Sequence, residues 1–129
     1  MSEMFSGIST YQRMLNYHLN RHNVIASNIA NIDTPGYVSK DLEAPKENKD
    51  DFGELLVRHK LDIKEQSFDE EEKSEIYDDP SAVPGNDGNT VDLDREMGKL
   101  AANTIKYQAI ATIVNKKLGM LRYAANDAK

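Results

Sequence analysis

The chain has 129 residues, which leaves room for one domain of ordinary size. Its 16 basic and 22 acidic side chains give a net charge of -6, so we set aside nucleic-acid binding, which depends on clustered Lys and Arg. The absence of cysteine excludes disulfides, thiolate zinc sites and cysteine nucleophiles. Leu, Ile, Val and Phe together number 28, which is little for a self-sufficient, enzyme-sized core.

A long helix is predicted at the N-terminus, because apolar positions recur there at alternating steps of three and four residues. A residue before proline is pushed out of the helical region, and Thr34 precedes Pro35. The helix should therefore end near Ile32 or Asp33. Its predicted seam runs through Met4, Ile8, Tyr11, Leu15, His18, His22, Ile25, Ile29 and Ile32.

The four residues after this helix, Thr34 to Tyr37, predict a tight turn. Pro35 presets a negative φ at the first central position, and Gly36 accepts a positive φ at the second. This combination is typical of a type II turn, and we expect Gly36 to tolerate no side chain.

Residues 41–80 carry 15 acidic and 6 basic side chains, so this middle segment can contribute little to a core. Two short elements are predicted in or near it, a helical turn over Phe52–Arg58 and a strand over Glu75–Tyr77. The acidic run Asp69–Glu72 is interpreted as a solvated surface rather than as a metal site.

A second long helix is predicted to begin between Thr90 and Asp92, after a stretch rich in Pro, Gly and Asn. Its first turn is acidic, as the helix dipole favours. The predicted seam runs through Leu93, Met97, Leu100, Thr104, Tyr107, Ala111, Val114, Leu118, Leu121 and Ala125.

The second helix is also apolar or small on its other sides. A line of mostly small residues runs from Gly98 to Gly119 with the same spacing, and Ile110, Ile113 and Met120 add a third side. One partner helix covers only one stripe of such a helix. Because glycines inside a helix are costly, we expect other copies or other proteins to pack closely against these lines.

These patterns predict an all-α fold whose long N- and C-terminal helices pair as a coiled coil, since a sustained repeat of 3.5 residues supercoils helices. The middle is expected to be short, irregular, and largely extended or disordered. We divide the chain into a helix and turn over residues 1–40, an acidic, flexible segment over 41–89 and a helix over 90–129. Both helical parts together should form one domain.

No catalytic template is recognisable, so no catalytic residue and no cofactor are predicted. The N-terminal sequence has no conventional secretory signal, and no run approaches the roughly 18 apolar residues of a membrane span. His18 and His22 stand four apart on one helical face, which lets two imidazoles reach one metal ion. No Glu lies between them, so we predict no metal site and interpret both as polar seam residues. A metal-binding helical protein that uses this pair is the alternative from a different class.

The stretch Ala26–Tyr37 resembles the N-terminal signature of the bacterial flagellar rod and hook proteins, an axial family that shares Asn-x-Ala-Asn-x-x-Thr-Pro-Gly-Tyr. The segment Asp87–Met97 is similar to the proximal rod members in particular. The resemblance covers residues 1–40 and 85–125, and the short length also fits a proximal rod protein.

The resemblance implies a structural subunit of the flagellar basal-body proximal rod, without catalysis. It implies export by the flagellar type III apparatus, without a cleaved signal peptide, into the periplasmic rod. The implied partners are other copies of itself, other rod proteins, the rod-base adaptor and the flagellar export gate, with no nucleic acid and no direct membrane insertion. Other short rod or rod-junction proteins, and an export chaperone or adaptor, are the alternatives.

Two sets of residues are predicted to carry this function. The axial-family motif falls on Asn28, Ala30, Asn31, Thr34, Pro35, Gly36 and Tyr37. The predicted assembly interface consists of Leu93, Met97, Gly98, Leu100, Ala101, Tyr107, Gln108, Val114, Leu118, Gly119 and Leu121.

Overall fold

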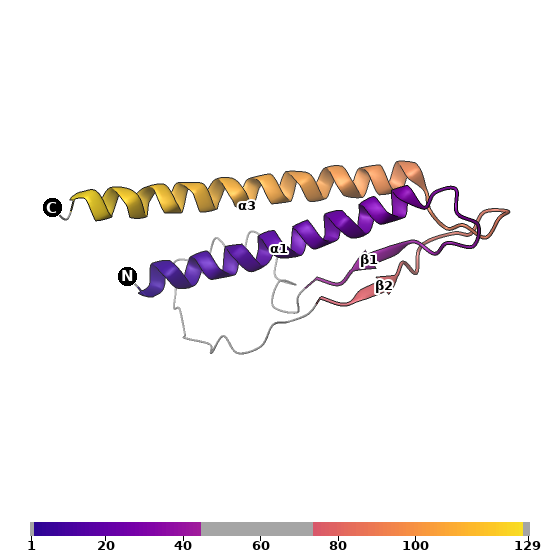
Figure 1. The fold of residues 1–129 in the computed structure, drawn as a ribbon, viewed down its shortest axis with the longest axis horizontal. Coiled ribbons are helices and arrows are strands. Elements are labelled where there is room, and N and C mark those ends of the chain that lie inside the picture. The colour runs from indigo at the N-terminus through magenta and orange to yellow at the C-terminus, as the bar shows by residue number, and fades with distance from the viewer. Residues whose placement is uncertain (1, 45–73, 128–129) are drawn as a thin grey trace.

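The computed structural model describes residues 2–44 and 74–127, and most of them form two long helices (Figure 1). Helix α1 spans Ser2–Ala30 and helix α3 spans Leu93–Asp127. The two helices lie side by side and run in opposite directions, so the end of α1 lies beside the start of α3. Both predicted helices are confirmed, whereas the predicted turn over Phe52–Arg58 lies outside the described residues.

Helix α1 ends at Ala30, slightly earlier than the Ile32 or Asp33 that we predicted. The amides of Asn31 and Thr34 each donate to a carbonyl three residues back, at 3.1 Å. Such bonds tighten the chain into turns and end the regular helix before the proline can do so.

Helix α3 begins at Leu93, just after the predicted range of Thr90 to Asp92. Asp92 is its N-cap, because its Oδ1 accepts from the amide of Asp94 at 3.0 Å and from the amide of Arg95 at 3.4 Å. Asp92 itself lies just outside the helix, and Asp94 and Glu96 lie in its first turn. The predicted acidic start is therefore confirmed, with Asp92 as the cap rather than as a helical residue.

A two-stranded antiparallel sheet joins the helices at one end. Strand β1 spans Lys40–Leu42 and strand β2 spans Ile76–Asp78. The strand predicted over Glu75–Tyr77 is confirmed with a shift of one residue, but β1 was not predicted. The sheet lies beside α1 in Figure 1, and the Tyr17 hydroxyl donates to the Leu42 carbonyl at 3.2 Å. Helix α1 is therefore covered by α3 and by this sheet.

Most of the predicted seam of α1 is buried or half-buried, and the side chain of Met4 lies outside the described residues. Ile25 is fully buried and His18 is 8 % exposed. His22 was predicted to lie in the seam, but its side chain is exposed. The half-buried seam residues are Ile8, Tyr11, Leu15, Ile29 and Ile32.

The buried row of α3 differs from the predicted one. Its buried residues are Glu96, Asn103 and Ile110, which recur every seventh position. The predicted seam residues Leu100, Val114 and Leu121 share this face and are half-buried.

Half of the predicted α3 seam is exposed, so the prediction that it packs against α1 is wrong for these residues. Leu93, Met97 and Leu118 are 45, 50 and 47 % exposed, and Tyr107 and Ala125 are exposed too. The register is shifted by one residue because polar side chains with partners on α1 occupy the buried row. A prediction that places the most apolar residues inside assigns the polar Glu96 and Asn103 to the surface.

The core of the described residues is more polar than apolar. Three apolar residues are buried there, Ile25, Leu42 and Ile110. The buried polar residues are His18, Asn28, Ser39, Asp41, Asp79, Asn89, Glu96 and Asn103. Every buried side-chain nitrogen or oxygen atom in the described ranges has a hydrogen-bond partner. Burying polar groups costs little only when they are paired, so matched hydrogen bonds decide how these elements fit.

No helix within residues 2–44 and 74–127 combines the length and the apolar character that crossing a bilayer requires.

Candidate functional site: a polar junction of two helices and a sheet

The end of α1, the sheet and the start of α3 meet around one side chain, Asn28. Its Nδ2 donates to the Lys40 carbonyl at 2.7 Å and to Glu96 Oε2 at 2.9 Å. Its Oδ1 accepts from the Lys40 amide at 3.0 Å and from the Tyr37 hydroxyl at 3.3 Å. The side chain is fully buried and uses both donors and both lone pairs, which an amide alone offers. We call the region around it the polar junction.

Glu96 is the partner of Asn28 on α3, and it is 2 % exposed. Its other oxygen, Oε1, accepts from the Ser39 hydroxyl at 3.1 Å and from Lys99 Nζ at 3.3 Å. One buried carboxylate therefore ties α1, the approach to β1 and the next turn of α3 together.

An ion network surrounds this pair. Lys99 Nζ lies 2.7 Å from Asp79, 3.3 Å from Glu96 and 3.7 Å from Asp41. Arg21 forms two hydrogen bonds with Asp41, at 2.9 and 3.0 Å.

A third cation, Arg95, donates to the Asp79 carboxylate at 2.9 Å and to the Ser81 hydroxyl. Three cations thus face three carboxylates, and the polar junction is balanced in charge.

The network changes the acidity of its members. Burial raises the pKa of Asp79, but hydrogen bonds from Lys99 and Ser81 outweigh this effect and hold the pKa well below its usual range. Burial likewise raises the pKa of Asp41, and its bonds to Arg21 and to the Leu42 amide reverse the shift. For Lys99, burial lowers the pKa, while the bond to Asp79 and the charge of Glu96 raise it by more. All these groups are therefore held in their charged forms at neutral pH.

Asn89, just before α3, also holds the turns that follow α1. Asn89 Nδ2 lies 2.9, 2.8 and 2.8 Å from the carbonyl oxygens of Asn31, Ile32 and Thr34. These carbonyls belong to the turns that follow Ala30, where no regular helix or strand supplies donors for them. Here the donor comes from more than fifty residues further along the chain.

Replacing Asn89 with alanine is expected to lower the free energy of unfolding by about 1–2 kcal/mol, because the carbonyls in the turns after α1 lose their shared donor. Chemical denaturation measures this change, and hydrogen exchange should become faster at the amides of Gly36 and Ser39. The matched control is Asn86→Ala, since Asn86 lies in the same loop and is exposed. Equal stability of the two variants would contradict this role of Asn89.

The Thr-Pro-Gly-Tyr turn has the predicted geometry. The Tyr37 amide donates to the Thr34 carbonyl at 3.3 Å, and Gly36 has a φ of +71°. The turn is held from outside, because the Gly36 amide donates to the Asp87 carbonyl at 3.1 Å and the Thr90 amide donates to the Tyr37 carbonyl at 3.0 Å.

Gly36 was expected to tolerate no side chain because the turn needs a positive φ at this position, and its φ of +71° supports that reason. A Cβ at Gly36 would meet no atom within 4 Å, so the restriction comes from the positive φ alone. We expect Gly36→Ala to cost about 1 kcal/mol in thermal or chemical unfolding, which is the ordinary penalty of that backbone conformation. A loss several times larger would mean that close packing, rather than φ, selects glycine.

A second polar contact lies midway along the helices. His18 Nδ1 is 2.7 Å from Asn103 Oδ1, and Asn103 Nδ2 donates to the His18 carbonyl at 2.8 Å. Because the amide nitrogen is the donor in one bond, the amide oxygen is left to accept in the other. The proton of the neutral imidazole is therefore assigned to Nδ1.

Acidification is expected to weaken the pairing of α1 with α3. Burial lowers the pKa of His18, and Lys106 and Arg21 lower it further, although the bond to Asn103 opposes them. The unfolded chain then binds a proton more readily than the native one, so stability is lost as the pH falls below about 6.5. Urea unfolding between pH 7.5 and 5.5 measures the loss. It should shrink in His18→Gln and persist in His22→Gln, and an unchanged slope in His18→Gln would contradict this cause.

The two histidines do not form a metal site together. His18 is buried with its Nδ1 bonded to Asn103, while His22 is exposed. Among residues 2–44 and 74–127, no group of three or more His, Asp or Glu side chains is arranged to hold a metal ion.

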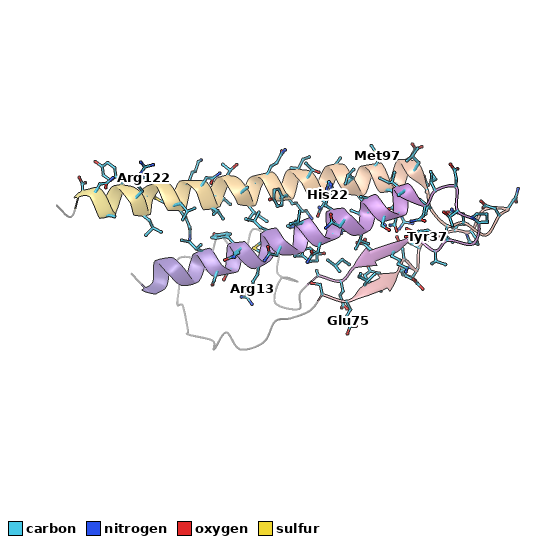
Figure 2. All side chains as sticks on the ribbon, in the orientation of Figure 1. Arg13, His22, Tyr37, Glu75, Met97 and Arg122 are labelled. Carbon is cyan, nitrogen blue, oxygen red and sulfur yellow. The ribbon has the colours of Figure 1, made fainter. Side chains whose placement is uncertain are left out.

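The predicted assembly residues of α3 fall into two groups. Leu100, Val114 and Leu121 are half-buried on the side that faces α1. The others are exposed, and Met97 lies on the side of α3 away from α1 (Figure 2). The exposed set is Leu93, Met97, Gly98, Ala101, Tyr107, Gln108, Leu118 and Gly119.

The polar junction therefore joins the two segments that resembled the axial family, and comparison with known proteins agrees with that resemblance. Residues 12–37 match the model of the flagella basal body rod protein family. The Salmonella typhimurium flagellar basal body rod protein FlgB is 35 % identical over 124 residues, covering 85 % of this chain and 86 % of the relative. The Bacillus subtilis FlgB is 33 % identical over 128 residues, covering 98 % of each chain. This chain belongs to the FlgB family.

Membership of the FlgB family determines the general function. The chain is a structural subunit of the flagellar basal body rod and is not an enzyme. The Escherichia coli FlgB, 30 % identical over 131 residues and 94 % of each chain, has the same description. The chain therefore assembles with rod components, and the polar junction is a structural site rather than an active site.

Several residues of the polar junction were missed from the sequence. Asn89 and Glu96 belong to the segment that was quoted for the resemblance, but only the acidic character of the first turn was used. Lys99, Asp41 and Asp79 gave no signal, because they are charged residues in charged surroundings. The usable signal was the presence of two motifs in one short chain, which favours a contact between them.

Proposed function

We propose that this FlgB-family chain is a proximal rod subunit that assembles through its two long helices with copies of itself and with other rod proteins. The observation that carries this proposal is the outer face of α3. Ile105 is 66 % exposed and Met97 is 50 % exposed, and a Cβ at Gly98 would meet no atom within 4 Å. A long helix whose outer face is apolar and small is expected to pack closely against neighbours.

The pairing of α1 with α3 is proposed to be coiled-coil-like. The buried residues of α3 recur every seventh position, and the half-buried Leu100, Val114 and Leu121 follow the same period. This period is the one that keeps a seam on one side of a supercoiled helix. We propose that the helices over residues 1–40 and 90–129 form one axial domain, to which the described parts of residues 41–89 are attached by Asp41, Asp79 and Asn89.

The polar junction is proposed to set the direction in which the chain leaves the axial helices. The family motif contributes Asn28 and Tyr37 to it, and Asn31 and Thr34 contribute carbonyls that accept from Asn89. Misdirecting this exit would displace everything between the helices relative to neighbouring subunits. The exposed interface residues of α3, from Leu93 to Gly119, are proposed to make the contacts between subunits.

The specific partners and the export route of the chain are proposed from its family membership alone. We propose the rod-base adaptor and the flagellar export gate as further partners, in addition to the next rod protein. We also propose that the chain reaches the rod through the flagellar type III apparatus without a cleaved signal peptide.

Deletion of the gene in its source bacterium tests the function. We expect swimming to be lost, and electron micrographs of isolated basal bodies should show the membrane ring without rod, hook and filament. The gene supplied in trans should restore all of them. Rotating flagella in the deletion strain, and in a strain that also lacks any paralogue, would overturn the proposal.

A point variant separates assembly from folding. Ile105→Glu places a charge on the outer face of α3, so it should leave the helix content and thermal unfolding of the isolated chain almost unchanged and prevent rod assembly. Lys106→Glu, one residue along and also exposed, is the matched control. Normal rods with Ile105→Glu would remove that face of α3 from the proposed interface.

A further inference from the structure

Helix α3 has a hollow near its C-terminal end. It is lined by Lys116, Gly119, Met120, Tyr123 and Ala124. Four of these residues stand at positions i, i+3, i+4 and i+7, which is the arrangement that receives one side chain of a facing helix in knobs-into-holes packing. The hollow is shallow and open, and its apolar lining suits an apolar side chain presented by another helix.

The described residues of the chain leave this hollow uncovered. A Cβ built at Gly119 meets no atom within 4 Å, and Met120 and Tyr123 are 59 and 71 % exposed. Helix α3 has 35 residues and α1 has 29, and the end of α3 extends past the start of α1 in Figure 1.

The charged side chain near Met97 that lies outside the polar junction is an acid, and the charged side chain that lines the hollow is a base. Lys116 lines the hollow, whereas the first turn at the other end carries Asp94 next to the exposed Met97. Within the described ranges, neither Lys116 nor Asp94 takes part in an ion pair. One end of the helix thus offers an apolar side chain with an acid, and the other a hollow with a base.

We propose that the hollow receives Met97 of a second copy, with Asp94 of that copy beside Lys116. This inference rests on the proposed self-assembly and specifies one of its contacts. Met97 and Gly119 are 22 positions apart on one helix, about 33 Å, so they cannot meet within a chain. Pairing either end with itself would bring like charges together, so the contact is head to tail, and such contacts continue from copy to copy.

The contact is small by itself. One side chain in one hollow buries far less than the roughly 1,000 Å² of a stable interface, so the contact forms only where other subunit contacts already hold the copies together. Assembled rods are therefore the sample in which to detect it.

The absence of cysteine makes a direct test possible. The variant carrying both Met97→Cys and Met120→Cys is expressed in the deletion strain, and purified basal bodies are oxidised and run on non-reducing gels. Because the two positions are too far apart to join within one helix, every disulfide links two chains. We expect species larger than dimers from the double variant and monomers from each single variant. Leu19→Cys with Met97→Cys is the control, since Leu19 is 50 % exposed on α1.

A charge exchange provides the second readout. Asp94→Lys and Lys116→Glu should each reduce incorporation into basal bodies by about two- to fivefold, and the combined variant should restore it. Asp33→Lys, at an exposed position outside α3, should have no effect.

Three results would overturn the proposal. Dimers from either single cysteine variant would mean a symmetric contact. A disulfide between Met120→Cys and a different protein would mean that another partner occupies the hollow. Incorporation of the double variant without cross-linked chains, together with no rescue by charge exchange, would remove the contact while the rod function stands. Absence of the unaltered chain from basal bodies would instead contradict the proposed function itself.

Discussion

Replacing Glu96 with alanine is expected to lower the free energy of unfolding by about 3–5 kcal/mol, the usual result of breaking a buried charged pair. The substitution leaves one of the two Asn28 Nδ2 hydrogens and the Ser39 hydroxyl without an acceptor, and it takes one of three carboxylates from Lys99. Total stabilities of small domains are about 5–15 kcal/mol, so the native state would lose a large share of its margin.

Chemical denaturation followed by circular dichroism measures the effect of this substitution. Asp94→Ala is the matched control, because Asp94 lies in the same turn of α3 and is exposed. Glu96→Gln should fall between the two, since its amide keeps one acceptor and turns a donor toward other donors. A loss below about 1 kcal/mol for Glu96→Ala would mean that water replaces the carboxylate and that the pair is not a fixed part of the fold.

Asn28→Asp is expected to destabilise the chain by about 3 kcal/mol or more at pH 7, although it changes the size of the side chain hardly at all. The amide nitrogen lies 2.9 Å from Glu96 Oε2 and 2.7 Å from the Lys40 carbonyl oxygen. An oxygen in its place accepts from neither of them and adds a second negative charge at a buried position. Asn23→Asp is the control, because Asn23 is exposed on the same helix.

The effect of Asn28→Asp should depend on pH in a definite direction. The charge of Glu96 and the burial raise the pKa of the introduced carboxyl in the folded state above its value in the unfolded chain. Its neutral form is therefore tolerated at low pH, and the stability difference from the unaltered chain should grow as the pH rises through that pKa. A difference that is the same at pH 4.5 and pH 7.5 would show that lost hydrogen bonds, rather than repulsion, cause the destabilisation.

The long helices and the turn could be predicted because local patterns encode them. Apolar residues at steps of three and four specify a helix whatever its partner, and Pro35-Gly36 specifies its turn through φ alone. The strand near Tyr77 was found for the same reason, from its β-prone residues. Its partner β1 has a charged residue at two of its three positions and pairs through its backbone, so its sequence gave no signal.

The register of α3 and the polar junction could not be predicted by the same means. Glu96 and Asn103 are buried because Asn28 and His18 stand opposite them, at separations of 68 and 85 residues. Periodicity describes one helix at a time and carries no information about which polar side chains will be paired across two. Asn28 and Asn31 were selected through the family motif, and their partners were not.

The polar seam has a mechanical consequence for a helical hairpin under load along its axis. Two apolar faces can slide past each other at little cost, because one methyl group replaces another. Asn28 with Glu96 and His18 with Asn103 are directional bonds at two points along the hairpin, so a slip by one helical turn, about 5.4 Å, breaks both and leaves buried groups unpaired. Resistance to shear between α1 and α3 is therefore built from a few hydrogen bonds, and single-molecule pulling should find a brittle hairpin that yields in one step.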